Sequence, residues 1–170
     1  MPRLPLTLET PLSQEAESIY AKATGAGSGL PDTYRALFAN PQLASKMAEL
    51  DGLVEANLES WVTLTVALTV AHERDCPVLW NSFEPLARSA GVANAVIEAI
   101  SAGTAPRGLL PKDGIWVHFT LEVLRNQMRD STWQAVTHLV GDSGAVSLAS
   151  TACYYEMMAR LNNAFGLDTA

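Results

Sequence analysis

The stretch at residues 60–73 is predominantly apolar. An apolar helix of this length is too short to span a bilayer, so we expect it to be the buried central helix of an all-α core. A charged turn at residues 74–75 follows it, and a second helix is predicted over residues 76–90, where Gly91 ends it. We expect the other elements to pack around this central hairpin.

Apolar residues at helical spacing predict further helices on both sides of the hairpin. At residues 41–57, Leu43, Met47, Leu50 and Val54 are spaced by four, three and four residues, which predicts one buried face. The other helices are expected at residues 15–24, 33–40, 92–103, 115–128 and 131–140, and from a cap at residue 142 or 143 to residue 165. Loops are expected at residues 25–29 and 104–114. No segment has the alternation of a strand, so the predicted fold class is all-α.

Prolines divide the chain into an arm and a helical domain. Pro2, Pro5 and Pro11 interrupt residues 1–12, and proline disfavours helix at its own position and at the residue before it. We therefore predict an extended N-terminal arm at residues 1–12, of the kind that often lies across a neighbouring subunit. The rest, residues 13–170, is predicted to be a single-domain helical bundle, because 170 residues that are 48% hydrophobic suffice for one core.

Charge and composition exclude several kinds of partner. The net charge is −7 with only 11 scattered Lys and Arg residues, so we expect no nucleic-acid partner. Cys76 and Cys153 lie far apart without a C-x-x-C pair, which indicates a reducing compartment. The N-terminus lacks the continuous apolar run of a signal peptide, and we expect a cytoplasmic protein without a membrane partner. The three His residues are widely spaced, and neither a metal nor an organic cofactor is expected.

Several segments match, in order, a family of helical proteins. They are GLPDTYRALFANPQLA (29–44), LTVA (68–71), W-x-x-x-EPLARSAGV (80–92), STW (131–133), GDSGAVSLAS (141–150), YY (154–155) and ARLNNAFG (159–166). In these segments the chain resembles the carboxymuconolactone decarboxylase-like family, which includes the alkyl hydroperoxidase D proteins. The resemblance implies a helical bundle of that type, assembled as a homo-oligomer, a trimer or hexamer, with a site beside the central hairpin and near subunit contacts.

The chain departs from this family at the positions that carry its chemistry. An acidic residue usually lies seven residues before the Ala of the LxVA motif, and a His three residues after the Trp; here these positions hold Leu64 and Phe83. The C-x-x-C of the peroxidase members falls on Cys76 and Leu79. Without a resolving thiol we do not expect peroxidase activity. Leu and Phe cannot exchange a proton, so any acid–base groups have moved.

His72, Cys76 and Glu84 are the candidate catalytic residues. His72 could titrate near neutral pH beside the hairpin, or it is simply a cation at a helix C-terminus. Cys76 falls in the first turn of a helix, where the dipole lowers a thiol pKa, or it is a small apolar core residue. Glu84 could act as a base in a dry pocket, or it pairs with Arg88 four residues later.

Tyr34 and Arg35 are candidates for substrate binding. The resemblance places their helix where it can face the pocket, and there a guanidinium would pair with a substrate carboxylate while a phenol adds a hydrogen bond. The alternative is that Tyr34 belongs to the core and Arg35 is solvated. The other side chains that we expect around the pocket are mainly apolar: Leu64, Leu68, Leu79, Trp80 and Phe83.

These observations predict a cofactor-independent lyase, such as a decarboxylase, or an isomerase. Its substrate would be a small or medium organic acid or lactone, more hydrophobic than the family's dicarboxylated substrates, because Leu64 and Phe83 replace polar groups. The alternative is a non-catalytic protein of the same fold that binds a hydrophobic ligand or serves an assembly. Only an enzyme should lose turnover and keep its fold when His72 or Glu84 is replaced.

Overall fold

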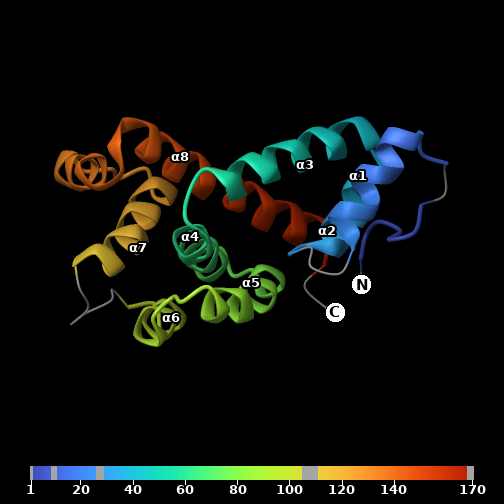
Figure 1. The fold of residues 1–170 in the computed structure, drawn as a ribbon. Helices are drawn as coiled ribbons and strands as arrows, with labels where there is room; N and C mark the ends of the chain where they lie inside the picture. The colour runs from blue at the N-terminus through green and yellow to red at the C-terminus, as the bar shows by residue number, and fades with distance from the viewer. Residues whose placement is uncertain (1, 9–10, 26–28, 105–110, 168–170) are drawn as a thin grey trace.

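The computed structural model describes residues 2–8, 11–25, 29–104 and 111–167. Over these ranges the chain is all-helical and contains no strand, which confirms the predicted fold class (Figure 1). The helices in the described ranges are α1 (Gln14–Thr24), α2 (Pro31–Leu37), α3 (Pro41–Ala56), α4 (Ser60–Glu73), α5 (Pro77–Ser89), α6 (Asn94–Ser101), α7 (Pro111–Leu124) and α8 (Asp130–Phe165). None of these helices is both long and apolar enough to cross a membrane.

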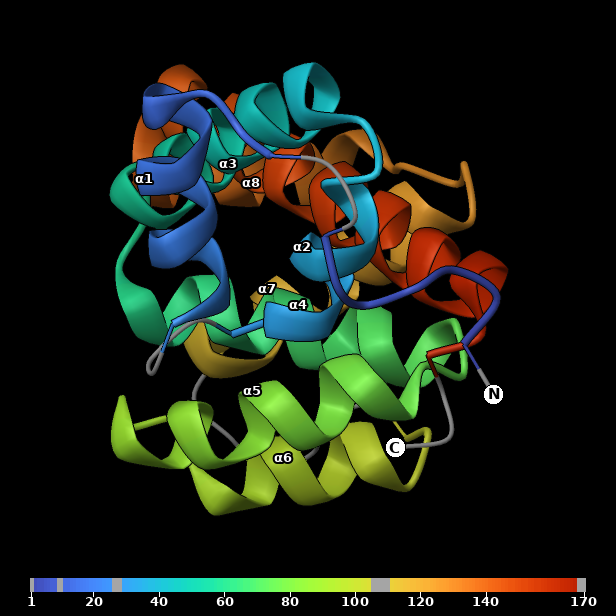
Figure 2. The same ribbon diagram turned by 90° about the vertical axis from the view of Figure 1, so that its right-hand side faces the viewer.

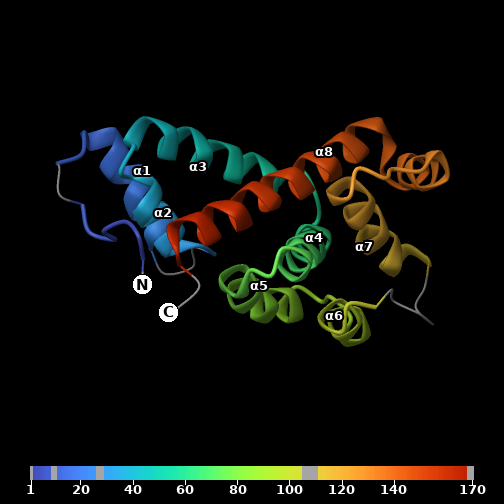
Figure 3. The ribbon, with the colours of Figure 1, turned by 180° about the vertical axis from the view of Figure 1, so that it is seen from behind.

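Helix α4 lies at the centre of the fold, as predicted. It packs against α5, α7 and α8, and the views in Figures 1 and 3 place it between them. Leu68 and Val70 have no exposed surface. Burial of such side chains is the main favourable term in folding, so α4 supplies the core on which the other helices assemble.

The turn between α4 and α5 is tight. The N–H of Cys76 donates to the carbonyl of Ala71 at 2.9 Å, and Asp75 has a φ of 47°, a left-handed conformation that Asp adopts more readily than most residues. Helix α5 then begins at Pro77, one residue later than predicted, because proline suits the first helical position.

Helix α8 consists of two arms joined at Gly141. This residue has φ 71° and ψ 175°, which is not helical, and the two predicted helices at 131–140 and 142–165 correspond to the two arms. At Gly144, three residues later, a β-carbon would lie 2.6 Å from the Cβ of Val140. Both glycines are therefore required by the geometry of the bend.

The start and the end of α7 differ from the prediction. Residues 111–114 were expected in a loop, but the helix begins at Pro111, again a proline at a first position. The helix ends at Leu124 and not at 128, because Asn126 takes a left-handed φ of 53°. Residues 26–28 and 105–110 of the two predicted loops lie outside the described residues.

The N-terminal arm binds to the end of α8 in the same chain. Its described residues, 2–8 and 11–12, are not helical. The N–H of Arg3 donates to the carbonyl of Phe165 at 2.8 Å, and its guanidinium donates to the carbonyls of Asn163 (3.1 Å) and Ala164 (2.6 Å). Arg3 thus supplies a cation and donors to the unsatisfied C-terminal carbonyls of α8. Figure 2 shows the N-terminal segment beside this end of α8.

Helix α3 buries a different face from the predicted one. Met47 and Val54 are buried, but Leu43 is 51% exposed and Leu50 is 40% exposed. The stripe that faces the protein runs instead through Ala44, Met47, Asp51 and Val54, at spacings of three, four and three residues. Consequently a carboxyl group, that of Asp51, lies on the inward face of α3.

Candidate functional site

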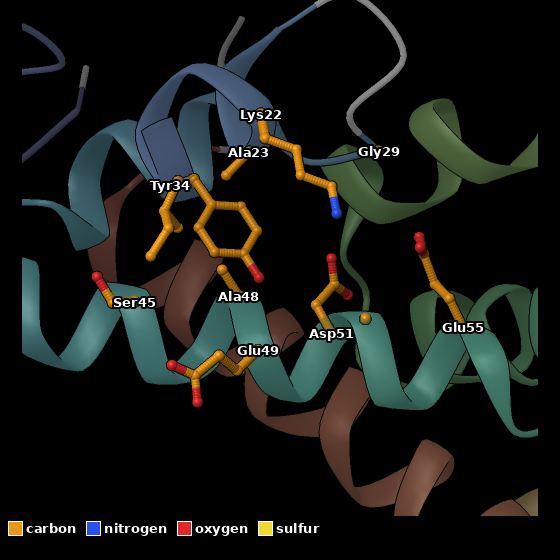
Figure 4. A pocket seen from close by; sticks show the side chains of 11 residues that line it. Lys22, Ala23, Gly29, Tyr34, Ser45, Ala48, Glu49, Asp51 and Glu55 are labelled. Carbon is orange, nitrogen blue, oxygen red and sulfur yellow. The ribbon is translucent and has the colours of Figure 1, made fainter. Parts of the chain in front are cut away.

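A cavity of about 440 Å³ lies between α1 and α3. We call it the α1–α3 cavity (Figure 4). Its volume is in the range of small-molecule sites. Apolar or small residues on both helices combine in its wall with a phenol, a hydroxyl, an amine and three carboxyl groups. The lining residues are Ile19, Lys22, Ala23, Gly29, Tyr34, Ser45, Ala48, Glu49, Asp51, Gly52 and Glu55.

Asp51 is held by a chain of hydrogen bonds that joins three helices. The hydroxyl of Tyr154 on α8 donates to Oδ1 of Asp51 at 2.7 Å, and the hydroxyls of Tyr34 on α2 and Tyr154 are 3.2 Å apart. Because the single proton of Tyr154 goes to Asp51, Tyr34 is the donor in the second bond. The chain therefore runs from Tyr34 through Tyr154 to the carboxylate.

The surroundings of Asp51 disfavour its charged form. Burial raises the pKa of the Asp51 carboxyl above its ordinary value, and the hydrogen bond from Tyr154 and the charge of Lys22 oppose this only in part. Burial, and next the charge of Asp51, also raise the pKa of Glu55. The same two causes raise the pKa of Tyr34 and Tyr154, so both phenols stay protonated and act as donors.

Helix α2 positions Tyr34 because it is anchored to α8. Thr33 donates to the side-chain oxygen of Asn162 at 2.9 Å in a fully buried bond, and Asn162 donates to the carbonyl of Met158 at 2.8 Å. Tyr34 itself is only 2% exposed. A buried, fully paired polar contact of this kind fixes the register of the two helices, and Tyr34 and Tyr154 meet as a result.

Phe83 lies behind the wall of this cavity. Its ring packs edge-on against Tyr155, with 5.3 Å between centroids, and Tyr155 packs in the same way against Tyr154. Gly29, which lines the cavity, approaches Phe83 so closely that a β-carbon would lie 2.6 Å from Cε1 of the ring. Phe83, a predicted pocket residue, therefore supports the α1–α3 cavity from the hairpin side.

Arg35 does not line the α1–α3 cavity. Its guanidinium pairs with Asp32, three residues earlier on α2, and this partner raises the pKa of Arg35. Both side chains are partly solvent-exposed. The structure thus places Tyr34 in a cavity and leaves Arg35 in a surface ion pair.

Three of the predicted residues meet in a second cavity, beside the hairpin turn. His72, Cys76 and Trp80 line this hairpin cavity of about 310 Å³, together with Asp75 and other residues of the turn. Cys76 is 1% exposed, whereas His72 is exposed. The imidazole lies against Gly103, where a β-carbon would be 3.1 Å from Nε2. The hairpin cavity offers less support for acid–base chemistry than the α1–α3 cavity. In the described residues, no carboxyl group lies within hydrogen-bonding distance of His72.

Glu84 forms an ion pair with Arg88, which is the structural alternative to a catalytic role for this residue. Arg88 donates to its carboxylate at 2.6 Å and also to Asn94 at 2.7 Å, which links α5 to the start of α6. Glu84 lines neither of the two cavities.

Three of the predicted apolar pocket residues, Leu64, Leu68 and Leu79, belong to the core. Leu68 and Leu79 have no exposed surface, and Leu64 is partly buried against the core. They support the helices and line neither cavity. Within the described residues, no group of three or more His, Cys, Asp and Glu side chains is placed to hold a metal ion.

Four residues of this region are not among those predicted from the sequence: Asp51, Tyr154, Lys22 and Glu55. A usable indication was present on α3, where the alternative stripe through Ala44 and Met47 places a carboxyl on an otherwise apolar face. The pairing of Asp51 with Tyr154 spans 103 residues, and no local pattern announces a contact of that separation.

Comparison of the chain with protein-family models, with curated proteins and with solved structures finds no match in any of the three.

Proposed function

We propose that the protein is a cofactor-independent lyase or isomerase and that the α1–α3 cavity is its active site. In this proposal Asp51 is the acid–base group, and it replaces His72, Cys76 and Glu84 in that role. The observation that carries the proposal is the hydrogen-bonded chain Tyr34–Tyr154–Asp51 at the wall of a cavity of small-molecule size.

The pKa of Asp51 supports this role. A general acid–base works best when its pKa lies near the working pH, and burial raises the pKa of Asp51 in that direction. Neither the carboxyl of Glu84, bound to Arg88, nor the exposed imidazole of His72 has a comparable position beside two phenols.

The proposed chemistry is proton transfer at a carbon next to a carbonyl group. The carboxylate of Asp51 takes the proton, the C–H electron pair moves toward the carbonyl oxygen, and an enolate forms. Once Asp51 is neutral, Tyr154 no longer donates to a charged acceptor. Tyr34, which lines the cavity, is then free to turn its O–H toward the enolate oxygen. In a β,γ-unsaturated substrate this enolate is conjugated, and return of the proton from Asp51 to the γ-carbon completes an isomerisation.

The same groups serve a lyase reaction of a β-oxo acid in the opposite sense. Cleavage of the bond to the departing carboxylate releases carbon dioxide and leaves its electron pair on the enolate. The neutral Asp51 carboxyl then protonates the carbon. Both reactions need the same neutral phenol and the same titrating carboxyl, so the class of substrate is a small or medium organic acid or lactone with a carbonyl group.

Membership of the carboxymuconolactone decarboxylase-like family and assembly as a trimer or hexamer are part of the proposal. Family membership is supported by sequence segments, among them LTVA and EPLARSAGV, that occur in the same order as in the family. Exposed apolar side chains support the second: Leu53 is 60% exposed and Val146 is 58% exposed. Multi-angle light scattering at micromolar protein tests the assembly, and a monomer would contradict it.

Turnover of a panel of lactones and β-oxo acids tests the function, with products read by mass. We expect Asp51→Asn to abolish conversion, because the amide cannot exchange the proton. Glu98→Gln on α6 is the control, since Glu98 is an exposed carboxylate that lines neither cavity. Circular dichroism checks that each variant is folded. If Asp51→Asn keeps full turnover while His72→Ala loses it, the hairpin cavity is the active site.

The second candidate function is a binding protein without catalysis. The apolar side chains of Ile19, Ala23 and Ala48 in the cavity favour it, because a hydrophobic ligand can pack against them. Such a protein would bind a hydrophobic ligand with equal affinity in wild type and in Asp51→Asn, and neither would convert any compound of the panel.

A further inference from the structure

Lys22 and Glu55 carry opposite charges on opposite walls of the α1–α3 cavity. Lys22 comes from α1 and Glu55 from α3, and both line the cavity. In Figure 4 the Lys22 chain reaches down toward the carboxyl of Asp51, while Glu55 rises from α3 into the same space. Burial raises the pKa of both Asp51 and Glu55, and the positive charge of Lys22 opposes this rise in each. The three groups therefore share one electrostatic environment.

The other two carboxyl groups in the lining already have partners. Both oxygens of Glu49 accept from Lys46 at 2.9 Å, and Asp51 accepts from Tyr154. By contrast, Lys22 and Glu55 make no hydrogen bond or ion pair with any residue in the described part of the chain. The cavity therefore presents one open cation and one open anion.

These two open charges flank the proposed acid–base group. Asp51 and Glu55 are four residues apart on α3, so their side chains are neighbours on one face, and the amine of Lys22 approaches from the other side (Figure 4). A ligand that carries only a carboxylate would pair with Lys22 and meet the repulsion of Glu55. A ligand that carries only an amine would meet the reverse.

We propose that the substrate is zwitterionic: an amino acid, or a derivative that keeps both an ammonium and a carboxylate group. Its carboxylate pairs with Lys22 and its ammonium with Glu55. The α-carbon, which carries both groups, then lies beside Asp51. The apolar wall of Ile19, Ala23 and Ala48 accepts an aliphatic side chain. This inference rests on the proposed function, since it names the substrate class for the same site.

Calorimetric binding of three probes of one carbon skeleton tests the inference. The probes are leucine, 4-methylpentanoate, which lacks the amine, and 3-methylbutylamine, which lacks the carboxylate. We expect leucine to bind most tightly to the wild-type protein. Each missing charge should weaken binding at least about threefold, the scale of a partly exposed ion pair.

Two variants assign each charge to its partner. Lys22→Gln should weaken leucine but not 3-methylbutylamine, and Glu55→Gln should weaken leucine but not 4-methylpentanoate. Arg160→Gln and Glu98→Gln are the matched controls, because both residues are exposed and line neither cavity. Equal affinity for all three probes, or the same loss in the controls, would overturn the inference.

The failure of this inference is distinguishable from failure of the proposed function. If an uncharged lactone is converted in an Asp51-dependent way while leucine does not bind, the function stands and the zwitterionic class is wrong. If leucine binds as expected and Asp51→Asn binds it equally, but the wild-type protein converts no amino acid, lactone or β-oxo acid, the site is a binding site and the function is wrong.

Discussion

Tyr154 donates a hydrogen bond of 2.7 Å to Asp51, although 103 positions separate the two residues in the chain. The bond joins the C-terminal arm of α8 to the inward face of α3 at the wall of the α1–α3 cavity. It favours the charged form of a carboxyl whose pKa is raised by burial. The same contact thus takes part in helix packing and sets the protonation of the proposed acid–base group.

Replacing Tyr154 by Phe should move the pH dependence of turnover. Without the donated bond the pKa of Asp51 rises further, so the acid limb of the kcat/KM profile shifts to higher pH. The loss of one buried hydrogen bond should also lower the free energy of unfolding by about 1 kcal/mol. Titration of the Asp51 carboxyl carbon by NMR, beside the rate profile, measures both effects.

Tyr155→Phe is the matched control for that variant. Tyr155 is equally buried, but its described contacts are ring contacts with Phe83 and Tyr154. Its replacement should leave the acid limb in place. Identical profiles for the two variants would show that the Tyr154 bond does not govern the titration of Asp51.

Asp51→Asn should become more stable, relative to wild type, as the pH rises. The pKa of Asp51 is raised in the folded protein, so the unfolded chain releases this proton first and wild-type stability falls from about pH 4 upward. The variant lacks that loss. Urea unfolding of both proteins at several values between about pH 4 and pH 7 gives the difference, and a difference that shrinks with rising pH would contradict the assignment.

Glu122→Gln should destabilise the protein at neutral pH, with the opposite pH dependence. Burial raises the pKa of Glu122, but bonds from the backbone and guanidinium of Arg129 and from Thr132 outweigh it, and the net pKa is lowered. The charged form is therefore stabilised in the folded state. We expect a loss of about 2 kcal/mol near pH 7 that fades as the pH falls below the ordinary range of a Glu.

Exposed Glu98 again provides the control for this measurement. Glu98→Gln on α6 should change the free energy of unfolding by less than about 0.5 kcal/mol at any pH. If Glu122→Gln is as stable as Glu98→Gln near pH 7, the contacts of Glu122 with Arg129 and Thr132 contribute nothing to the free energy of unfolding.

Gly141→Ala and Gly52→Ala should have opposite effects on stability. Gly141 has a φ of 71°, and an Ala there is strained by about 1–2 kcal/mol. Gly52 lies inside α3 with open space where a β-carbon would stand, so Ala should stabilise the helix by about 0.5–1 kcal/mol. Thermal unfolding monitored by circular dichroism compares the pair; a stabilising Gly141→Ala would contradict the bend in α8.

The elements with strong local patterns could be predicted from the sequence. The apolar run of α4, the charged turn after it and the helix stop at Gly91 are all short-range features, and so is the break at Gly141. Prediction failed on α3, where the more apolar of two registers does not face the protein. On α3 the stripe with Leu43 and Leu50 contains more large apolar residues, but the stripe with Ala44 and Asp51 faces the protein.

The candidate site was harder to predict than the fold. Tyr34 is among the predicted binding residues and lines the α1–α3 cavity, but its partners Asp51 and Tyr154 come from helices distant in sequence. Their meeting depends on packing, on the Thr33–Asn162 bond among other contacts. The resemblance to the family predicts a site beside the hairpin. His72 and Cys76 do line one cavity there, but Glu84 pairs with Arg88.

The most direct test of the central claim is the exchange of solvent deuterium into the carbon next to the carbonyl of a bound substrate, followed by NMR. The account predicts exchange by the wild-type protein and by His72→Ala, and none by Asp51→Asn with its fold intact. Undiminished exchange by Asp51→Asn would contradict it, because the proton would then be moved by another group.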